Sequence, residues 1–146
     1  MSSAPSNRDW RIVVATAMVV SALFVAGCSG SSSEYTSTIS DPSTGDVIDS
    51  VSVDTINQLD GARFDMDYSI NATDNATYSL VVYERQNGSL EWDGVYSLDP
   101  NRYHTGVSVN PPLPDEPPAT YEIRIECGEN ATVLDAVTVT VGVSSS

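Results

Sequence analysis

The residue types that could carry catalysis are sparse and isolated in this sequence. His104 is the only histidine among 146 residues, so a metal site built on two or three histidines cannot form. A Ser-His-Asp arrangement would need His104 beside an activated serine, and no G-x-S-x-G nucleophile motif is present. An exposed histidine at the start of a strand is the simpler interpretation. The sequence therefore predicts no catalytic residue and no enzymatic activity.

Aspartates at alternate positions raise the question of a calcium site. Asp65 and Asp67 fall on the same side of an expected strand, and Asp74 precedes Asn75 in the following loop. Calcium takes about six to eight oxygen ligands, several of them from one loop, and no contiguous D-x-D-x-[DN]-G loop occurs. In so acidic a chain, a solvated acidic face is the simpler explanation. We expect no bound metal and no cofactor.

Four asparagines stand in Asn-x-Ser/Thr sequences, which are the acceptor pattern for N-linked glycosylation. Each falls in an expected turn or loop, where a glycosyltransferase could reach it. The alternative is that these asparagines serve only the geometry of tight turns. The four candidate glycosylation sites are Asn71, Asn75, Asn87 and Asn130.

A cysteine stands directly after a long apolar run near the N-terminus. A flank with two arginines precedes 16 uncharged residues, which end in the sequence LFVAGC at Cys28. A positive flank, an apolar run and small residues before a break are the parts of a signal peptide. The sequence LFVAGC resembles the lipobox of prokaryotic lipoproteins. That resemblance implies that residues 1–27 are removed and that Cys28 carries a diacylglyceryl anchor as the mature N-terminus.

The predicted anchor fixes the expected location of the rest of the chain. The basic flank stays on the cytoplasmic side, so residues 29–146 are expected outside a cell membrane to which Cys28 attaches them. The alternative is an uncleaved signal anchor. Its apolar run is shorter than the roughly 20 residues needed to span a bilayer core, but tilting and a snorkelling Arg11 could compensate.

The charge balance is the strongest compositional signal. The chain has 20 acidic residues against 6 arginines, contains no lysine, and has a formal net charge of −14. Because no basic patch exists to neutralise phosphates, nucleic acid is excluded as a partner. A lysine-free, aspartate-rich surface resembles that of proteins from extreme halophiles, particularly haloarchaea. Concentrated salt would screen its self-repulsion, since the Debye length is about 3 Å at 1 M.

Beyond the anchor, the chain divides into a linker and one β-rich domain. Residues 28–46 are rich in serine, threonine and glycine and are expected to form a flexible linker. From residue 47 to 143, short alternating apolar runs are separated by turn residues, a pattern typical of an all-β sandwich, and residues 144–146 are a tail. The expected strands cover 47–53, 64–70, 78–83, 90–98, 103–109, 121–127 and 132–143, the last with Val133, Val137, Val139 and Val141 inward.

Two turns and one tyrosine refine this picture. Asn87-Gly88 favours a tight hairpin turn, and five prolines exclude a central strand over Asn110–Pro118. About seven strands of this size resemble an immunoglobulin-like or fibronectin type III-like domain. Tyr121 matches its tyrosine corner, in which the hydroxyl bonds to upstream backbone. The resemblance implies an antiparallel sandwich preceded by the signal helix and the linker. Cys127 has no second-strand partner and is expected to be a buried thiol, with an intermolecular bridge as the alternative.

The sequence supports two interpretations of function. The first is a surface binding or adhesion module, or an accessory subunit, with a surface protein or a glycan as its partner. The second is a structural, glycosylated component of the cell envelope without a specific ligand. Several aromatic residues could supply a binding surface, although sheet packing is their commoner role; they are Tyr78, Tyr83, Trp92, Tyr96 and Tyr103.

The expected topology also separates two ends of the domain. In an immunoglobulin-like sandwich, Asn71, Asn75 and Asn130 are expected at the end to which the tether attaches. The proline-rich connection Asn110–Pro118 and the Asn87 hairpin are expected at the opposite end. We therefore expect a partner to meet the end that carries the proline-rich connection.

Overall fold

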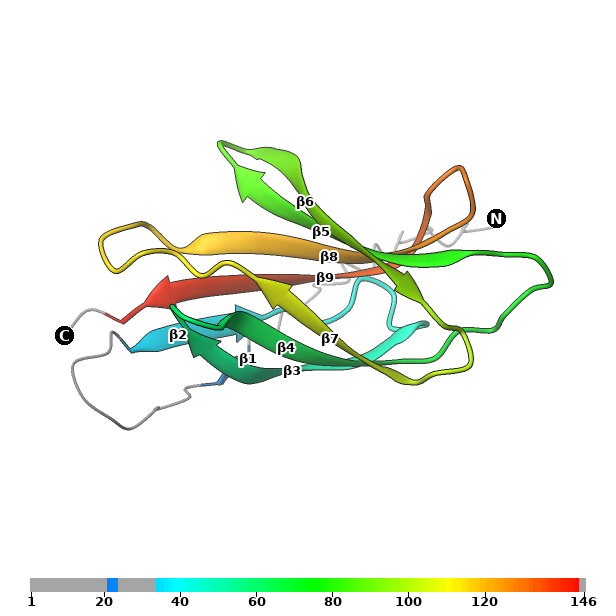
Figure 1. Cartoon of the computed structure of the whole chain (residues 1–146), viewed down its shortest axis with the longest axis horizontal. Helices are drawn as coiled ribbons and strands as arrows, with labels where there is room; N and C mark the ends of the chain where they lie inside the picture. Colours follow the sequence, from blue (N-terminus) through cyan, green and yellow to red (C-terminus); the bar gives the residue numbers. More distant parts are fainter. Residues whose placement is uncertain (1–20, 24–33, 145–146) are drawn as a thin grey trace, which may run out of the picture.

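The computed structural model describes residues 21–23 and 34–144, and within these ranges the chain is built from nine β-strands. They form two antiparallel sheets that face each other (Figure 1). The large sheet has the order β1-β2-β9-β8-β5-β6, and the small sheet has the order β3-β4-β7. The strands are β1 (Ser21–Leu23), β2 (Tyr35–Ile39), β3 (Ile48–Asn57), β4 (Gly61–Tyr68), β5 (Tyr78–Gln86), β6 (Ser89–Leu98), β7 (His104–Val109), β8 (Ala119–Cys127) and β9 (Thr132–Val143).

The prediction of an all-β, immunoglobulin-like sandwich is confirmed. The seven expected strands correspond in chain order to β3 through β9, and every pair of neighbouring strands is antiparallel. Strands β3, β4 and β7 cover one side of the core, while β9, β8, β5 and β6 cover the other. The apolar residue at every second position of a strand therefore points into the core, because a strand in such a sandwich buries one face and exposes the other.

The local turn predictions are also confirmed. Asn87 and Gly88 join β5 to β6 with φ angles of 50° and 83°, the left-handed geometry that an Asn-Gly hairpin turn requires. Residues 110–118 contain no strand and connect β7 to β8 across the two sheets. Their prolines lack the N–H groups that a strand would donate to its neighbours.

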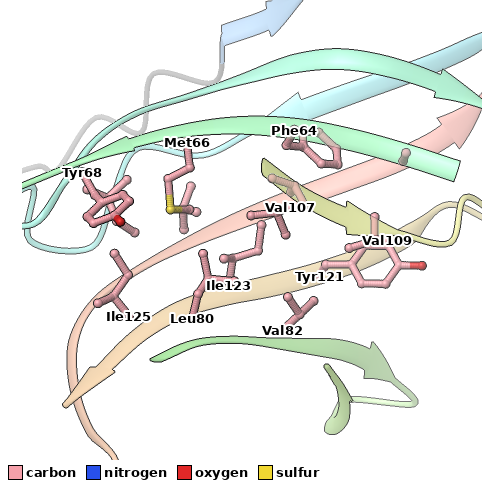
Figure 2. Packing of buried hydrophobic residues seen from close by; sticks show 14 of the residues in the cluster. Phe64, Met66, Tyr68, Leu80, Val82, Val107, Val109, Tyr121, Ile123 and Ile125 are labelled. Carbon is pink, nitrogen blue, oxygen red and sulfur yellow. The ribbon is translucent and has the colours of Figure 1, made fainter. Parts of the chain in front are cut away.

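The core lies between the two sheets and is built from alternate residues of both (Figure 2). β4 contributes Phe64, Met66 and Tyr68, which are at most 1% exposed. Burying side chains of this size stabilises the fold by about 1.5–3 kcal/mol each. The opposing large sheet contributes Leu80, Val82, Tyr121, Ile123, Ile125, Val137, Val139 and Val141.

The structure corrects the predicted linker. Residues 35–39, inside the region expected to be flexible, form β2 and pair with β9 from Tyr35↔Val143 to Ile39↔Val139. The side chain of Tyr35 is buried, and its hydroxyl donates a hydrogen bond to the carbonyl oxygen of Pro112 at 3.0 Å. The strand forms because β9 offers an unpaired edge and the core accepts the tyrosine ring, so tertiary contacts override a linker-like composition.

The structure also differs from the predicted N-terminal signal helix at three residues. Ser21–Leu23 form β1, which pairs with the outer edge of β2 from Ser21↔Ile39 to Leu23↔Ser37. An edge strand presents unpaired backbone groups that can accept any extended segment, which accounts for a strand here. The remainder of the predicted signal segment, and Cys28, lie outside the described residues.

One buried carboxylate fixes the segment that crosses from the large sheet to the small one. Asp135 of β9 is fully buried. A register shift between Ile125 and Glu126 of β8 leaves Leu134 without an opposite residue, so Asp135 points inward and Val133 is 45% exposed. The prediction that Val133 lies in the core is therefore wrong, because a bulge exchanges the faces of a strand.

The carboxylate of Asp135 is bonded by backbone and side-chain donors of this crossing segment. Oδ1 accepts from the Ser43 hydroxyl at 3.0 Å and from the Thr44 N–H at 2.9 Å, and Oδ2 accepts from the N–H groups of Val47 at 3.2 Å and Ile48 at 3.0 Å. Burial acts to raise the pKa of this carboxyl, but the donors outweigh it and lower the pKa to about 2. Asp135 therefore holds the start of β3 in place as a buried anion.

Candidate functional site

The outward face of the large sheet carries exposed apolar side chains where β5, β6 and β8 lie side by side. Trp92 is 63% exposed and Val95 is 54% exposed, although large apolar side chains in a small domain are normally covered. Each lies in a row of residues that face one another across the strands: Val95 is opposite Val81, which is opposite Arg124, and Trp92 is opposite Tyr83, which is opposite Glu122. We call this surface the outer-sheet patch, and it consists of Val81, Tyr83, Trp92, Val95, Glu122 and Arg124.

A bulge in β6 brings the two exposed residues to the same face. Val82 pairs with Gly94, but the next residue, Tyr83, pairs with Trp92, so Asp93 has no opposite residue. Strict alternation from Val95 would turn Trp92 toward the other face, since side chains alternate along a strand. Bulges redirect side chains in this way and are frequent near functional sites. The bulge therefore places the tryptophan beside the tyrosine ring of the neighbouring strand.

Charged side chains hold the rest of the patch in a fixed arrangement. The guanidinium of Arg124 lies 4.7 Å from the centre of the Tyr83 ring, a cation–π contact. Its Nε donates to Oε1 of Glu122 at 2.7 Å, while Nη2 of Arg85 donates to Oε2 of Glu122 at 3.4 Å. The Tyr83 hydroxyl donates to Oε1 of the buried Glu126 at 3.4 Å. The patch therefore combines aromatic surface with hydrogen-bonding groups whose positions are set before any ligand arrives.

This arrangement is suited to binding rather than to reaction. Aromatic rings at a protein surface offer large, rigid contact area, and tryptophan, tyrosine and arginine are the residues most often dominant in interfaces. The patch residues include no serine, cysteine or histidine. β6 is also the edge strand of the large sheet, so the backbone groups on its outer side are available to a partner strand.

The side chains that most resemble an active site are His104, Asp65 and Asp67, and they contact one another on the outward face of the small sheet. Nδ1 of His104 lies 2.8 Å from Oδ1 of Asp67, and its Nε2 lies 3.5 Å from Oδ1 of Asp65. The hydrogen bond that Asp67 accepts from His104 raises the pKa of His104 and lowers the pKa of Asp67. The Ser50 hydroxyl donates to Asp67 at 3.1 Å and not to the imidazole, so these side chains do not form a Ser-His-Asp relay. The aspartates predicted to share a face do so, and they pair with the histidine.

Two hollows flank the proline-rich connection. One of about 470 Å³ lies between this connection and the turn end of the β5–β6 hairpin, and the other, of about 440 Å³, lies against the turn between β3 and β4. The Tyr121 hydroxyl donates to the carbonyl oxygen of Asn110, which confirms the predicted tyrosine corner. Burial raises the pKa of this hydroxyl, and the nearby carboxylates of Glu84, Asp93 and Glu116 act in the same direction.

The five aromatic residues proposed from the sequence do not form one surface. Tyr78 is buried, and Tyr103 is 71% exposed next to the start of β7, in the small sheet. Tyr96 extends along the sandwich edge, where its hydroxyl donates to the carbonyl oxygen of Ser108 at 3.4 Å. Only Tyr83 and Trp92 meet in the patch. Glu122 and Arg124 were not predicted as patch residues, and the signal that could have found them is the polar residue at every second position of 121–127.

The structure reverses the predicted relation between the tether and the two ends of the sandwich. We call the end with Glu34, Val143, the β3–β4 turn and residues 110–118 the proline end, and the end with residues 69–77 and 128–131 the sequon end (left and right in Figure 1). The expectation that the proline-rich connection lies away from the tether is wrong, because Tyr35 bonds to Pro112. The unexpected strand β2 causes the reversal, since it brings the chain in at the proline end.

Three of the four candidate glycosylation sites lie together at one end of the sandwich, as expected. The loop with Asn71 and Asn75 meets the turn with Asn130 at the sequon end, where the Gly128 N–H donates to the Thr77 carbonyl at 2.9 Å. Asn87 lies beside the proline-rich connection, lining the hollow of about 470 Å³ with Pro112. Three candidate sites therefore lie at the end opposite to Glu34.

Neither a cluster of metal-ligand residues nor a membrane-spanning helix is found in the part of the chain that the structure describes. Within residues 21–23 and 34–144, no group of three or more histidine, cysteine or acidic residues is arranged to hold a metal ion. In the same ranges there is no helix long and apolar enough to cross a membrane.

Cys127 is a free, half-buried thiol packed against the core. No family model matches the chain, and no curated protein is significantly similar to it.

Proposed function

We propose that this chain is a lipid-anchored binding module on the extracellular face of a halophile membrane, acting as an adhesion domain or accessory subunit. The lipobox-like sequence ending at Cys28 supports the anchor, and the net charge of −14 without lysine supports the saline setting. Glu34 lies only six residues after Cys28, so the sandwich follows the anchor closely. The partner is a surface protein or a glycan of the same envelope.

The exposed Trp92 in the outer-sheet patch is the observation that carries this proposal. The bulge at Asp93 turns the ring outward beside Tyr83, while a regular strand would have pointed it the other way. On the other side of Tyr83, the Arg124 and Glu122 side chains are already ordered by their mutual hydrogen bond. A partner that covers the patch gains apolar burial without the cost of ordering these side chains, which is the advantage of preorganisation.

Purification of the full chain from native membranes in high salt tests this binding role. Wild-type protein is compared with Trp92→Ala and with Tyr103→Ala, which removes an equally exposed aromatic residue outside the patch. We expect a stoichiometric partner with wild type and Tyr103→Ala, and at least a tenfold loss with Trp92→Ala, because central aromatic residues contribute about 2 kcal/mol or more to binding. A partner retained equally by Trp92→Ala would contradict the assignment of the patch.

The anchor is tested on the same preparations. Mass spectrometry is expected to find a mature chain beginning with diacylglyceryl-Cys28, and Cys28→Ala is expected to leave the membrane fraction. If Cys28→Ala remains fully membrane-bound, the lipoprotein assignment fails and an uncleaved N-terminal anchor replaces it.

A structural envelope component is the second candidate function. The clustering of Asn71, Asn75 and Asn130 at the sequon end favours it, because glycans there would coat the end of the domain farthest from Glu34. Wild-type protein that carries sugars on these asparagines but binds no partner would favour this alternative over the binding module.

A further inference from the structure

Two exposed leucines lie at the proline end, at the tips of two different turns. Leu59, between β3 and β4, is 96% exposed, and Leu113, in the proline-rich connection, is 54% exposed. Both line the same hollow of about 440 Å³, together with Pro111 and Val109. Two separate segments thus bring apolar side chains to one depression, beside Asp60 and Asp93.

The turn that carries Leu59 is held rigidly. Oδ1 of Asn57 accepts hydrogen bonds from the N–H groups of Leu59 at 2.9 Å and Asp60 at 2.7 Å. Gly61 follows with φ of 84°, and a Cβ there would lie 3.1 Å from the Val109 carbonyl oxygen. The close approach locks this turn against β7, so the leucine at its tip has a defined position.

The turn that carries Leu113 is closed by a reciprocal pair of bonds. The Leu113 N–H donates to Oε2 of Glu116 at 2.8 Å, and the Glu116 N–H donates to the Leu113 carbonyl at 3.0 Å. Fixed prolines on both sides restrict its backbone further. Both leucines are therefore presented by ordered backbone.

The path of the chain brings this end close to the predicted anchor. The Ser144 N–H donates to the Glu34 carbonyl at 2.8 Å, and Tyr35 bonds to Pro112, so the first described residue after Cys28 is fixed at the proline end. Six residues span at most about 20–22 Å when fully extended. A membrane-embedded lipid on Cys28 would thus hold the proline end within that distance of the headgroups.

We propose that the proline end rests on the membrane and that Leu59 and Leu113 insert into the headgroup region of the bilayer. This proposal rests on the lipid anchor of the proposed function. Two leucines alone would bind lipid weakly, but the anchor makes the contact intramolecular and raises its effective concentration. Asp60 and Glu116 beside them would be repelled by anionic lipid in dilute buffer, and high salt screens that repulsion.

Depth-dependent fluorescence quenching tests this contact on the full, lipidated chain. Trp10 and Trp92, the only tryptophans, are replaced by phenylalanine, and one new tryptophan is introduced as Leu59→Trp, Leu113→Trp or Val133→Trp. Val133 is the matched control, because it is 45% exposed at the sequon end. Each variant is reconstituted in high salt into phosphatidylcholine vesicles with or without brominated acyl chains.

We expect bromine to quench about half of the emission at positions 59 and 113, since interfacial apolar side chains lie ~5–10 Å deep at the headgroup–acyl boundary. Emission at position 133 is expected to stay unchanged. Vesicle-bound protein with no quenching at 59 and 113, or with equal quenching at 133, would overturn the orientation while leaving the anchor intact. A blue shift without bromine-dependent quenching would indicate a second protein copy over the leucines and would also overturn it. Protein that fails to associate with vesicles would overturn the anchor itself.

Discussion

At the scale of single residues, Asp135 shows how a charged side chain can be part of a core. It is buried in a strand whose next three inward residues are valines, and it accepts hydrogen bonds from the segment between β2 and β3 and from the first residue of β3. Hydrogen bonds to a charged group contribute more than neutral ones, about 1.5–3 kcal/mol each. The carboxylate therefore adds a polar link between the two sheets beside their apolar contacts.

Replacement of Asp135 by asparagine should destabilise the domain strongly. One side-chain oxygen would become an NH₂ group facing backbone N–H donors, which leaves buried donors unpaired. We expect a loss of about 3 kcal/mol or more in the free energy of unfolding, measured by denaturant titration in high salt. Asp46→Asn, an exposed change in the same crossing segment, is the control and should alter stability little.

The same residue should make the domain sensitive to acid. Its folded pKa of about 2 lies below the ordinary value of 3.8 for an aspartate, so its contribution is fully present above about pH 5. The contribution declines as the pH falls from there through about 2, because the unfolded chain binds the proton at a higher pH than the folded chain does. The shift corresponds to about 2 kcal/mol. Unfolding measured from pH 5 to pH 2 should show this decline in wild type, and a parallel decline of equal size in Asp135→Asn would contradict the assignment.

At the scale of elements, alternation in the sequence predicted strands wherever apolar residues recur at every second position. It succeeded for β4 and β8, whose inward residues are all apolar. It failed for β2, where Tyr35 and Ile39 are the only large apolar residues and Ser37 is buried between them. Composition favours a linker there, and only the free edge of β9 decides otherwise. The outer-sheet patch was foreseen only in part, because the bulge at Asp93 and the register of β5 against β8 are not encoded in local pattern.

The structural role of β2 can be tested at its buried tyrosine. Tyr35→Ala removes a ring from the core and the hydrogen bond to Pro112, and we expect it to lower the free energy of unfolding by about 3 kcal/mol. Thr36→Ala, on the opposite face of the same strand, should change it by less than about 1 kcal/mol. If Tyr35→Ala were as stable as wild type, the segment would behave as the linker that its composition suggests.

At the scale of the whole molecule, charge and position of the ends matter most. Twenty acidic residues against 6 arginines give self-repulsion that folding concentrates in a small volume. The ion pairs in the described ranges are few, and most lie at the surface, where each contributes about 1 kcal/mol or less. Long-range repulsion should therefore dominate the electrostatic part of stability.

Stability should accordingly rise with salt. Between 0.1 M and 1 M salt the Debye length falls from about 10 Å to about 3 Å, so repulsion between carboxylates is largely removed. We expect the urea midpoint of unfolding to increase over this range. Potassium chloride and sodium chloride should act similarly if screening is the cause. A midpoint that is constant or falls with salt would contradict this account.

The pairing of β2 with β9 also determines where foreign sequence can be attached. Ser144 is bonded to Glu34, so a reporter fused after the last strand would emerge beside the start of β2, and under the proposed lipid anchor it would lie on the membrane side of the domain. The β8–β9 turn, with Gly128 and Ala131 at positive φ, projects from the opposite end. If the proposed anchor holds, peptides inserted at this turn would be displayed on the side of the domain that faces away from the membrane.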